Sequence, residues 1–326
     1  MNKIVSTYKD RDDAVHPFDT PYYYEWWYFD GVFENGYTFT VSCFWRAIIM
    51  GNPAPFIMMS IYTPDGKKID GAEVFDYSNS HASPNKCDAT INKNYIKQQG
   101  DVYKISMHVA QLGANMGVEM TYTRKVPGWK WSESGILLDD ENGKQGWVCP
   151  VPMGHAEGKL FIDGKAIPVK GKGYHDHNWG DTLMSKSMKG WVWGRMFHQE
   201  YTFVYFYLMP LTIETGINSA LFIMKKDKPI FACTPAKFTM GKNVLHEETG
   251  KSIPTDIVIE GSSDGVDVHC HLDVVKVLHS TISEPDDAGF ISYYYRRFNK
   301  YDARITIDGK PITVTGDAIN EHVLLR

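Results

Sequence analysis

Short apolar segments bounded by turn residues follow one another along most of the 326-residue chain. Many of them alternate apolar with polar residues, or are apolar throughout, as β-strands are. The spacing of an amphipathic helix is hard to find. The pattern therefore predicts an all-β protein. The expected strands are residues 37–45, 57–62, 102–109, 118–123, 159–162, 201–209, 220–224, 256–260, 266–277 and 303–307.

Dipeptides that favour positive φ angles separate several of these segments, as expected where tight hairpin turns join strands. Short strands separated by such turns are typical of sandwiches and barrels. The dipeptides are Asn35-Gly36, Asp65-Gly66, Asn142-Gly143, Asp163-Gly164, Asp264-Gly265 and Asp308-Gly309.

An internal repeat divides the chain into two similar parts. Residues 162–171 recur as residues 307–316, an offset of 307 − 162 = 145. A shorter echo relates Tyr37-Thr38-Phe39 to Tyr201-Thr202-Phe203. We therefore predict two β-rich domains, an N-terminal one over residues 1–185 and a C-terminal one over residues 186–326.

Extending the longer repeat without gaps aligns Asp176 with Glu321 and His177 with His322. Groups that both halves share favour a role in ending a strand, whereas groups found only in the first half favour a role in chemistry. The groups found only in the first half are His175, Asn178 and Trp179.

Composition narrows the class of protein. Hydrophobic residues make up 43% of the chain, and the formal charge is −5 with scattered basic residues, so we expect no nucleic-acid partner. Five cysteines without a C-x-x-C pair favour a reducing compartment. Residues 1–20 lack the apolar core of a signal peptide, and no uncharged run is long enough to cross a membrane. We expect a soluble cytoplasmic protein without an integral membrane segment, whose oligomeric state the sequence leaves open.

The densest group of proton-transfer side chains lies at residues 174–180, with the sequence YHDHNWG. If this segment is a strand, His175, His177 and Trp179 share one face. Such a face could protonate a substrate and shield a cation. The structural alternative is a hydrogen-bonded strand end whose histidines are satisfied by backbone carbonyls. The opposite face, where the aspartate could accept a proton from an imidazole on a neighbouring strand, would hold Tyr174, Asp176 and Asn178.

His175 and His177 also form an H-x-H pair, which can supply two ligands to iron, manganese or zinc. A second such pair, at residues 269–271, alternates with apolar residues and is expected to face solvent. The chain has no phosphate-binding glycine loop and no G-x-S-x-G motif. We therefore expect neither a metal nor another cofactor. The nearby residues that could complete a metal site, although no spacing singles them out, are His155, Glu157 and His198.

An aromatic run, YYYEWWYFDG, occupies residues 22–31. So many consecutive aromatic side chains cannot all enter one core, so one face is expected to line a cavity and attract positive charge. Trp26 and Trp27 are candidate substrate-binding residues there. The alternative is an aromatic plug at the mouth of a barrel. A carboxylate inside such a run is costly unless it is paired or used, which makes Glu25 a candidate acid.

A second aromatic segment, residues 201–209, is apolar throughout and is expected to be buried on both faces, with Tyr205 and Tyr207 on the same side. Upstream of it, Arg195 is the candidate counter-charge for Asp176 or for the carboxylate of the first aromatic run. Plain core packing with a satisfied salt bridge explains these residues equally well.

At these residues the chain resembles the carotenoid 1,2-hydratase / AttH-like family of tandem lipocalin-like proteins, whose relatives include fungal Diels–Alderases and, more distantly, tocopherol cyclase. The resemblance spans nearly the whole chain. It implies two tandem lipocalin-like antiparallel barrels, with an apolar ligand in or between them and no cofactor. The motifs concerned are Glu25-Trp26-Trp27-Tyr28, the segment GYHDHNWG at residues 173–180, and Trp191-x-Trp193-Gly194.

For the hydratases of this family, the resemblance implies protonation of an alkene and quenching of the resulting cation by water. His177 and Trp179 match motif positions implicated in that chemistry. An aspartate acid expected on the later aromatic strand is not evident, because Tyr205 and Tyr207 occupy that neighbourhood. This leaves Asp176, or the carboxylate of the first aromatic run, as the proton source.

We therefore hypothesise a cofactor-independent enzyme that acts on a hydrophobic small molecule, a polyene or isoprenoid, by acid-promoted hydration, isomerisation or cyclisation. His177 and Asp176 are the expected proton-handling pair, with Glu25 as an alternative acid. The competing hypothesis is a non-catalytic lipocalin-like carrier of a hydrophobic compound. The expected substrate-binding residues are Trp26, Trp27, Tyr174, His175, Asn178, Trp179, Trp193, Arg195, Tyr205 and Tyr207.

Overall fold

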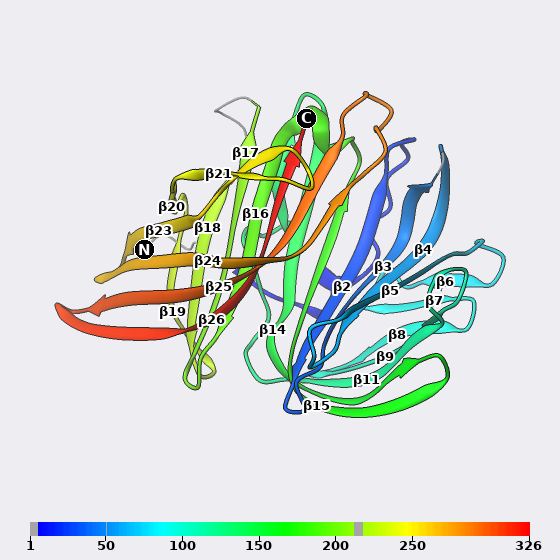
Figure 1. Cartoon of the computed structure of the whole chain (residues 1–326), viewed down its shortest axis with the longest axis horizontal. Coiled ribbons are helices and arrows are strands. Elements are labelled where there is room, and N and C mark those ends of the chain that lie inside the picture. Colours follow the sequence, from blue (N-terminus) through cyan, green and yellow to red (C-terminus); the bar gives the residue numbers. More distant parts are fainter. Residues whose placement is uncertain (1–5, 50, 212–217) are drawn as a thin grey trace. The chain divides into compact units, whose positions relative to one another are not determined.

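The computed structural model describes residues 6–49, 51–211 and 218–326. Its regular structure is almost entirely β, which confirms the predicted all-β class (Figure 1). Within these ranges the helical elements are a 3-10 turn, Asp10–Asp13, and the single turn α1, Met184–Ser187. Neither helix has the length and apolar character needed to cross a membrane.

All ten predicted strands are present, and most are longer than the sequence pattern indicated. Residues 201–209 lie in β17 (Tyr201–Pro210), and residues 159–162 are only the end of the long strand β14 (Gly143–Ile162). The aromatic run was expected to line a cavity or plug a barrel and was not among the predicted strands. Most of it forms β2 (Tyr24–Phe33), because aromatic residues suit a pleated, buried surface.

The chain divides into two compact units. The described part of the N-terminal unit comprises residues 6–49, 51–136 and 144–182, and that of the C-terminal unit comprises residues 137–143, 183–211 and 218–326. The domain boundary expected at residue 185 stays a prediction.

One curled antiparallel sheet organises the N-terminal unit, with the order β10-β5-β4-β3-β2-β15-β14-β11-β9-β8-β7-β6 among the described residues. Short strands β1, β12 and β13 lie off this path. The bounds not yet given are β1 Ser6–Thr7, β3 Thr38–Ile49, β4 Asn52–Tyr62, β5 Lys68–Val74, β6 Ser80–Ala82, β7 Asp88–Ile91, β8 Asn94–Gln99, β9 Val102–Val109, β10 Leu112–Gly113, β11 Met116–Arg124, β12 Trp129–Lys130, β13 Ile136–Asp140 and β15 Lys165–Gly180.

A second curled antiparallel sheet organises the C-terminal unit, with the order β19-β18-β17-β16-β26-β25-β24-β23-β20, and β21 pairs separately with β22. Along β24, Val266, Val268, Cys270 and Leu272 are buried, which confirms the expected core face of that strand. The bounds are β16 Met188–Phe197, β18 Ser219–Lys225, β19 Lys228–Cys233, β20 Lys237–Met240, β21 Asn243–His246, β22 Lys251–Pro254, β23 Asp256–Ser263, β24 Val266–Ile282, β25 Ser292–Ile307 and β26 Lys310–Leu325.

The two sheets correspond strand by strand. The central run β3-β2-β15-β14-β11 of the first matches β17-β16-β26-β25-β24 of the second. The longer sequence repeat forms the equivalent hairpins β14–β15 and β25–β26, whose turns have φ of 47° and 79° at Asp163 and Gly164, and of 48° and 77° at Asp308 and Gly309. The internal repeat is therefore a structural repeat. The predicted fold class, two tandem lipocalin-like antiparallel barrels, is confirmed, with one curled, half-barrel sheet in each unit.

Candidate functional site

The pairing of β2 with β15 builds one face of the candidate site. Because side chains alternate along a strand, every second cross-strand pair projects to the same side of the sheet, and three such pairs form this face. The rings of Trp27 and His177 stack with centroids 4.6 Å apart, and those of Phe29 and His175 with centroids 3.9 Å apart. The three pairs are Glu25 with Trp179, Trp27 with His177, and Phe29 with His175.

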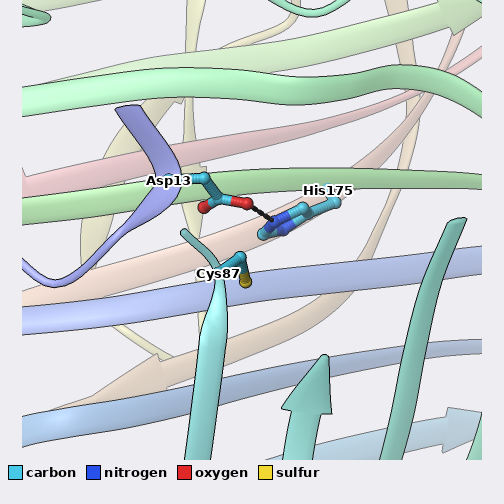
Figure 2. A group of neighbouring side chains, drawn as sticks. All are labelled: Asp13, Cys87 and His175. Carbon is cyan, nitrogen blue, oxygen red and sulfur yellow. Dashed lines mark hydrogen bonds and ion pairs between the residues drawn. The ribbon is translucent and has the colours of Figure 1, made fainter. Parts of the chain in front are cut away.

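Asp13, the last residue of the 3-10 turn, is fully buried against this face. Its Oδ2 lies 3.0 Å from Nε2 of His175, and its Oδ1 lies 3.2 Å from Nδ1 of His177. Its backbone carbonyl accepts a hydrogen bond of 3.1 Å from the indole of Trp27. Figure 2 shows the carboxylate turned toward the His175 ring, with the sulfur of Cys87 beside them. A short N-terminal turn thus places a carboxylate between the two imidazoles.

Glu25 provides a second buried carboxylate on the other side of His177. Its Oε1 lies 2.9 Å from Nε2 of His177 and accepts a hydrogen bond of 2.8 Å from the backbone N–H of His16. The hydroxyl of Tyr23 donates to Oε2. The ring of His16 stacks on Trp179 at 3.8 Å and remains 26% exposed. His177 is therefore held between two carboxylates, and His16 is the partly exposed member of the group.

The electrostatics follow from this arrangement. Burial of the His177 ring disfavours its charged form, but contacts with Asp13 and Glu25 outweigh that penalty and raise its pKa to about 9. Burial likewise opposes ionisation of both carboxyl groups, yet the adjacent imidazoles hold the pKa of Asp13 and of Glu25 below its ordinary value. Burial lowers the pKa of His16 despite its contact with Glu25. At neutral pH, the centre is an imidazolium between two carboxylates, beside a neutral imidazole.

The contacts of His177 are ion pairs rather than well-aligned hydrogen bonds. Both of its ring nitrogens lie within 3.2 Å of a carboxylate oxygen, but among the described residues neither meets the angles of a hydrogen bond. The ring of His175 is more firmly oriented, because its Nδ1 lies 2.9 Å from the backbone carbonyl of Tyr28 and its Nε2 makes the contact with Asp13. His175 is thus fixed in place, and the His177 ring is held mainly by charge and stacking.

Two groups of side chains have donor types that suit a metal ion. The first group is Asp13, Cys87 and His175. In this group, and in a second one named below, the donor atoms lie within 4.8 Å of one another. The sequence pair His175 and His177 is divided between the two groups rather than sharing one. Structural zinc sites use four protein donors and catalytic ones three, so each group has the donor number of a catalytic site, although its carboxylate and imidazole groups already contact one another. The second group is His16, Glu25 and His177.

The opposite face of β15 holds a separate hydrogen-bonded set. Asp176 accepts hydrogen bonds of 2.9 Å from the hydroxyl of Tyr174 and 2.8 Å from the amide of Asn178. The predicted division of residues 174–179 between two faces is therefore confirmed. Asp176 and His177 project to opposite sides of the sheet, so the two residues expected to handle protons together do not face each other.

Comparison with known proteins places this arrangement in a recognised fold. Residues 138–244 match the Diels-Alderase-like family. The AttH-type protein of Nitrosomonas europaea superposes with a TM-score of 0.69 over 99% of this chain and 98% of that chain, at 14% identity. The chain has the AttH-like fold. The resemblance predicted from the sequence motifs is thereby confirmed.

Two further relatives extend the comparison. CghA, solved alone and with the compound Sch210972, superposes with a TM-score of 0.65 in both cases at 14% identity; the matches cover 96% and 98% of this chain and 93% and 98% of those chains. A hydroxyneurosporene dehydrogenase from Chlorobaculum tepidum is 24% identical over 228 residues, which are 59% of this chain and 58% of that protein. The match thus spans little more than half of that relative.

The AttH-like fold divides the expected substrate-binding residues between its two units. Those on β16 and β17 lie in the C-terminal unit, where the Arg195 guanidinium covers the ring of Phe197 at 4.3 Å and Tyr207 stacks on Phe238 at 5.3 Å. Glu25 makes its contacts with His16, Tyr23 and His177, all in the N-terminal unit. The expected pairing of Arg195 with Asp176 or the Glu25 carboxylate stays a prediction. The remaining members are Trp26, Trp27, Tyr174, His175, Asn178 and Trp179 in the N-terminal unit, and Trp193 and Tyr205 in the C-terminal unit.

Asp13 and His16 were not among the candidates from the sequence, and Tyr23 was singled out only as part of the aromatic run at residues 22–31. Asp13 ends a strongly charged stretch that reads as a solvated N-terminal segment, and His16 precedes a proline in a loop. The available signal was weak: Ala14 and Val15, two apolar residues directly after the charged stretch, indicate that this segment turns inward. No spacing relates these residues to the central motif, because the contact between Asp13 and His175 joins positions 162 residues apart.

Proposed function

We propose that this chain is a cofactor-independent enzyme that acts on an apolar polyene or isoprenoid by acid-promoted chemistry. The observation that supports this best is the His177 imidazolium, buried between the carboxylates of Asp13 and Glu25 and stacked on Trp27. Acid-promoted reactions of alkenes need a positioned proton donor and a surface that stabilises the resulting cation, and indole rings stabilise cations well. The match to the Diels-Alderase-like family agrees with chemistry that needs no cofactor.

In this proposal His16 is the residue that meets the substrate. It is the most exposed member of the group, its Nδ1 lies 3.3 Å from Glu25, and its ring stacks on Trp179. A proton held by His177 can reach His16 through the shared carboxylate. The lowered pKa of His16 makes its protonated form a stronger acid than a free imidazolium. His177 then serves as the proton reservoir, and Glu25, ionised at neutral pH, serves as the relay rather than as the original acid.

The reaction step balances as a simple proton transfer. The N–H bond of the His16 imidazolium breaks, a C–H bond forms at one alkene carbon, and positive charge appears on the other carbon beside Trp179. Water can add to that carbon and return a proton to the His16–Glu25 pair, which gives hydration. Loss of a proton from a neighbouring carbon to the His16–Glu25 pair gives isomerisation. Attack by a second double bond closes a ring and moves the positive charge to a new carbon, which then loses a proton to the same pair or adds water, and this gives cyclisation.

A carrier of hydrophobic compounds is the second candidate function. The feature that favours it is the closure of the cluster on itself, since Asp13, Glu25, His175 and His177 are all buried and contact one another. In a carrier this charged group would only fasten the N-terminal segment to the sheet.

Incubating the purified chain with a panel of linear terpenoids and polyenes distinguishes the two. Mass spectrometry should reveal a product of equal mass, or of one added water. His177→Gln, which cannot hold the proton, should lower turnover by roughly 10² to 10⁴-fold, as should His16→Gln. His322→Gln is the matched control, because it alters the equivalent position of the other unit and should retain turnover. A panel compound that is bound but recovered unchanged would establish the carrier, and full activity in folded His177→Gln would refute the proton route.

A further inference from the structure

Neighbouring arginines on β25 of the C-terminal unit differ in their partners. The guanidinium of Arg296 lies 2.5 Å from the carboxylate of Glu321. Arg297 is 0% exposed, yet among the residues that the structure describes no carboxylate lies within ion-pair distance of it. Its Nε donates to Oδ1 of Asn320 at 2.9 Å, its Nη1 reaches the carbonyl of Pro254 at 3.4 Å, and its Nη2 has no hydrogen-bond partner. A buried positive charge without a counter-ion is costly, so a missing anion is the simplest account of it.

Further unsatisfied donors surround this cation. The side-chain amide nitrogen of Asn320 and the hydroxyl of Tyr205 are both buried, and in the described parts of the chain neither meets the geometry of a hydrogen bond. The side chain of Asn320 is close enough to act on the phenol, since it lowers the pKa that burial of Tyr205 raises. Tyr205 and Asn320 are adjacent, since a Cβ added at Gly194 would lie 2.2 Å from the Tyr205 hydroxyl oxygen and 2.8 Å from Cβ of Asn320. Native proteins rarely bury several unsatisfied donors in one place without a partner for them.

Among the described residues, no carboxylate forms an ion pair that offsets the guanidinium of Arg297. His322, two positions along β26 from Asn320, is driven neutral because burial and then the charge of Arg297 lower its pKa to about 3. The adjacent hydrophobic cluster consists of Ile253, Tyr295 and Leu324, and Tyr205 belongs to the main core of the unit. The centre therefore combines one positive charge and several free N–H and O–H donors with apolar walls.

We propose that Arg297, Tyr205 and Asn320 form a binding site for the carboxylate group of an apolar small molecule inside the C-terminal unit. A carboxylate has two oxygens with room for several donors, and arginine recognises it with parallel hydrogen bonds. The apolar walls select a ligand whose charged group is attached to a hydrocarbon body. The site is independent of the proton-transfer centre around His177, which lies in the other unit.

Gly194 contributes to the same proposed binding site. The hydroxyl of Tyr205 occupies the space that a side chain at position 194 would need. The corresponding residue in the N-terminal unit is Phe29, which pairs with His175 as Gly194 pairs with Asn320. Absence of a side chain at Gly194 therefore makes room for a hydroxyl donor beside the amide.

Octanoate is a suitable probe, because it combines a carboxylate with a short apolar tail. Isothermal titration of the full chain should show saturable binding of octanoate but not of octan-1-ol, which has the same chain length without the charge. Arg297→Met should weaken octanoate binding by at least about tenfold, because it removes the charged donor. Arg304→Met is the matched control: Arg304 is an exposed arginine on the same strand, and its loss should leave binding unchanged.

Control experiments test the proposed carboxylate site separately from folding and from catalysis. Circular dichroism should confirm that Arg297→Met folds; if it does not, Tyr205→Phe, which removes only the hydroxyl, should still weaken octanoate binding several-fold. Sulfate that binds as tightly as octanoate would show an inorganic anion site and overturn the apolar-ligand assignment. Absence of octanoate binding, or equal binding by parent and folded Arg297→Met, would overturn the site altogether. None of these readouts depends on turnover, so their failure is distinguishable from failure of the proposed enzymatic function.

Discussion

His177 and His322 occupy equivalent places in the two sheets but have opposite electrostatic surroundings. His177 lies between the carboxylates of Asp13 and Glu25, which raise its pKa, whereas His322 is buried beside Arg297, and its pKa is lowered. A shared residue in a repeat would ordinarily indicate a shared structural task. The surroundings differ because one neighbour, Asp13, comes from the N-terminal segment, which precedes the repeated part of the chain. The same side chain is therefore a positively charged ring in one unit and a neutral ring in the other.

The raised pKa of His177 gives stability a definite dependence on pH. The folded chain holds this proton up to about pH 9, whereas an unperturbed imidazole releases it near 6.5. The stabilisation is therefore complete below pH 6.5 and is lost as the pH rises through about 9. Between these pH values we expect the free energy of unfolding of the parent to fall by on the order of 1 to 3 kcal/mol. In His177→Gln, which lacks the titrating ring, this fall should be absent. Urea denaturation between pH 6 and pH 10 measures it, and an unchanged pH profile in His177→Gln would contradict the assignment.

Asp13 should be the most sensitive carboxylate of the N-terminal segment. Asp13→Asn keeps the shape but removes the charge that faces His175 and His177, leaving buried positive charge with one counter-ion fewer. We expect a destabilisation of about 3 to 5 kcal/mol, as for breaking other buried ion pairs. Asp19→Asn, an exposed aspartate of the same segment, is the control and should cost less than about 0.5 kcal/mol. Thermal melting at pH 7 compares them, and similar melting temperatures for the two variants would rule out a charge role for Asp13.

For single residues, the sequence predicted which face of a strand a side chain occupies better than it predicted which residues that side chain contacts. Alternation sufficed to put His175, His177 and Trp179 on one side of β15, because a strand has only two sides. It could not reveal Asp13 or His16, since their contacts depend on how an irregular N-terminal segment folds back over the sheet. It also could not reveal that the Glu25 carboxylate finds its partners, Tyr23 and His177, within the same unit.

Among the elements, the two hairpins of the repeat are the most regular feature. Asp163-Gly164 and Asp308-Gly309 adopt nearly the same left-handed angles, and a Cβ added at either glycine would meet nothing within 4 Å. Substitution should therefore cost only backbone strain, without steric clashes. The strands themselves were predictable in position but not in length, because β14 continues far beyond the apolar run that identified it, through residues that pair with β15 and β13.

We expect Gly164→Ala and Gly309→Ala each to lower stability by about 1 kcal/mol, the usual cost of placing alanine in the left-handed region. Asparagine tolerates this region better, so Gly164→Asn and Gly309→Asn should cost less. Chemical denaturation of the four variants provides the comparison. A large difference between the alanine variants would mean that the two turns are not energetically equivalent, whatever their angles.

For the whole molecule, the five cysteines report on the two units separately. All are free and buried, with Cys43, Cys87 and Cys149 in the N-terminal unit and Cys233 and Cys270 in the C-terminal unit. Thiols in such positions react only when the surrounding structure opens. The five cysteines can therefore be used as internal probes of local opening in each unit. The reducing compartment that they indicated stays a prediction.

His177→Gln should accelerate labelling of the three N-terminal cysteines by at least about tenfold relative to the parent, because it weakens the centre that fastens residues 10–16 to their sheet. Labelling of the two C-terminal cysteines should change little. Pulsed alkylation at a fixed pH, read by mass spectrometry of peptides, gives all five rates in one experiment. Equal acceleration at every cysteine would indicate that the chain opens as a single cooperative unit.

The contribution of Asp13 and His16 to the buried centre also limits how the chain can be shortened or fused. A version trimmed to begin at β2 would retain Glu25, His175 and His177 but would lose one of the two carboxylates and the imidazole that stacks on Trp179. Purification tags or fusion partners are better attached after residue 326, and cleavage by a contaminating protease within residues 8–16 would disturb a motif that lies 162 positions away. Preparations should therefore be checked for intact residues 8–16 before a weak result in the proposed activity assay is interpreted.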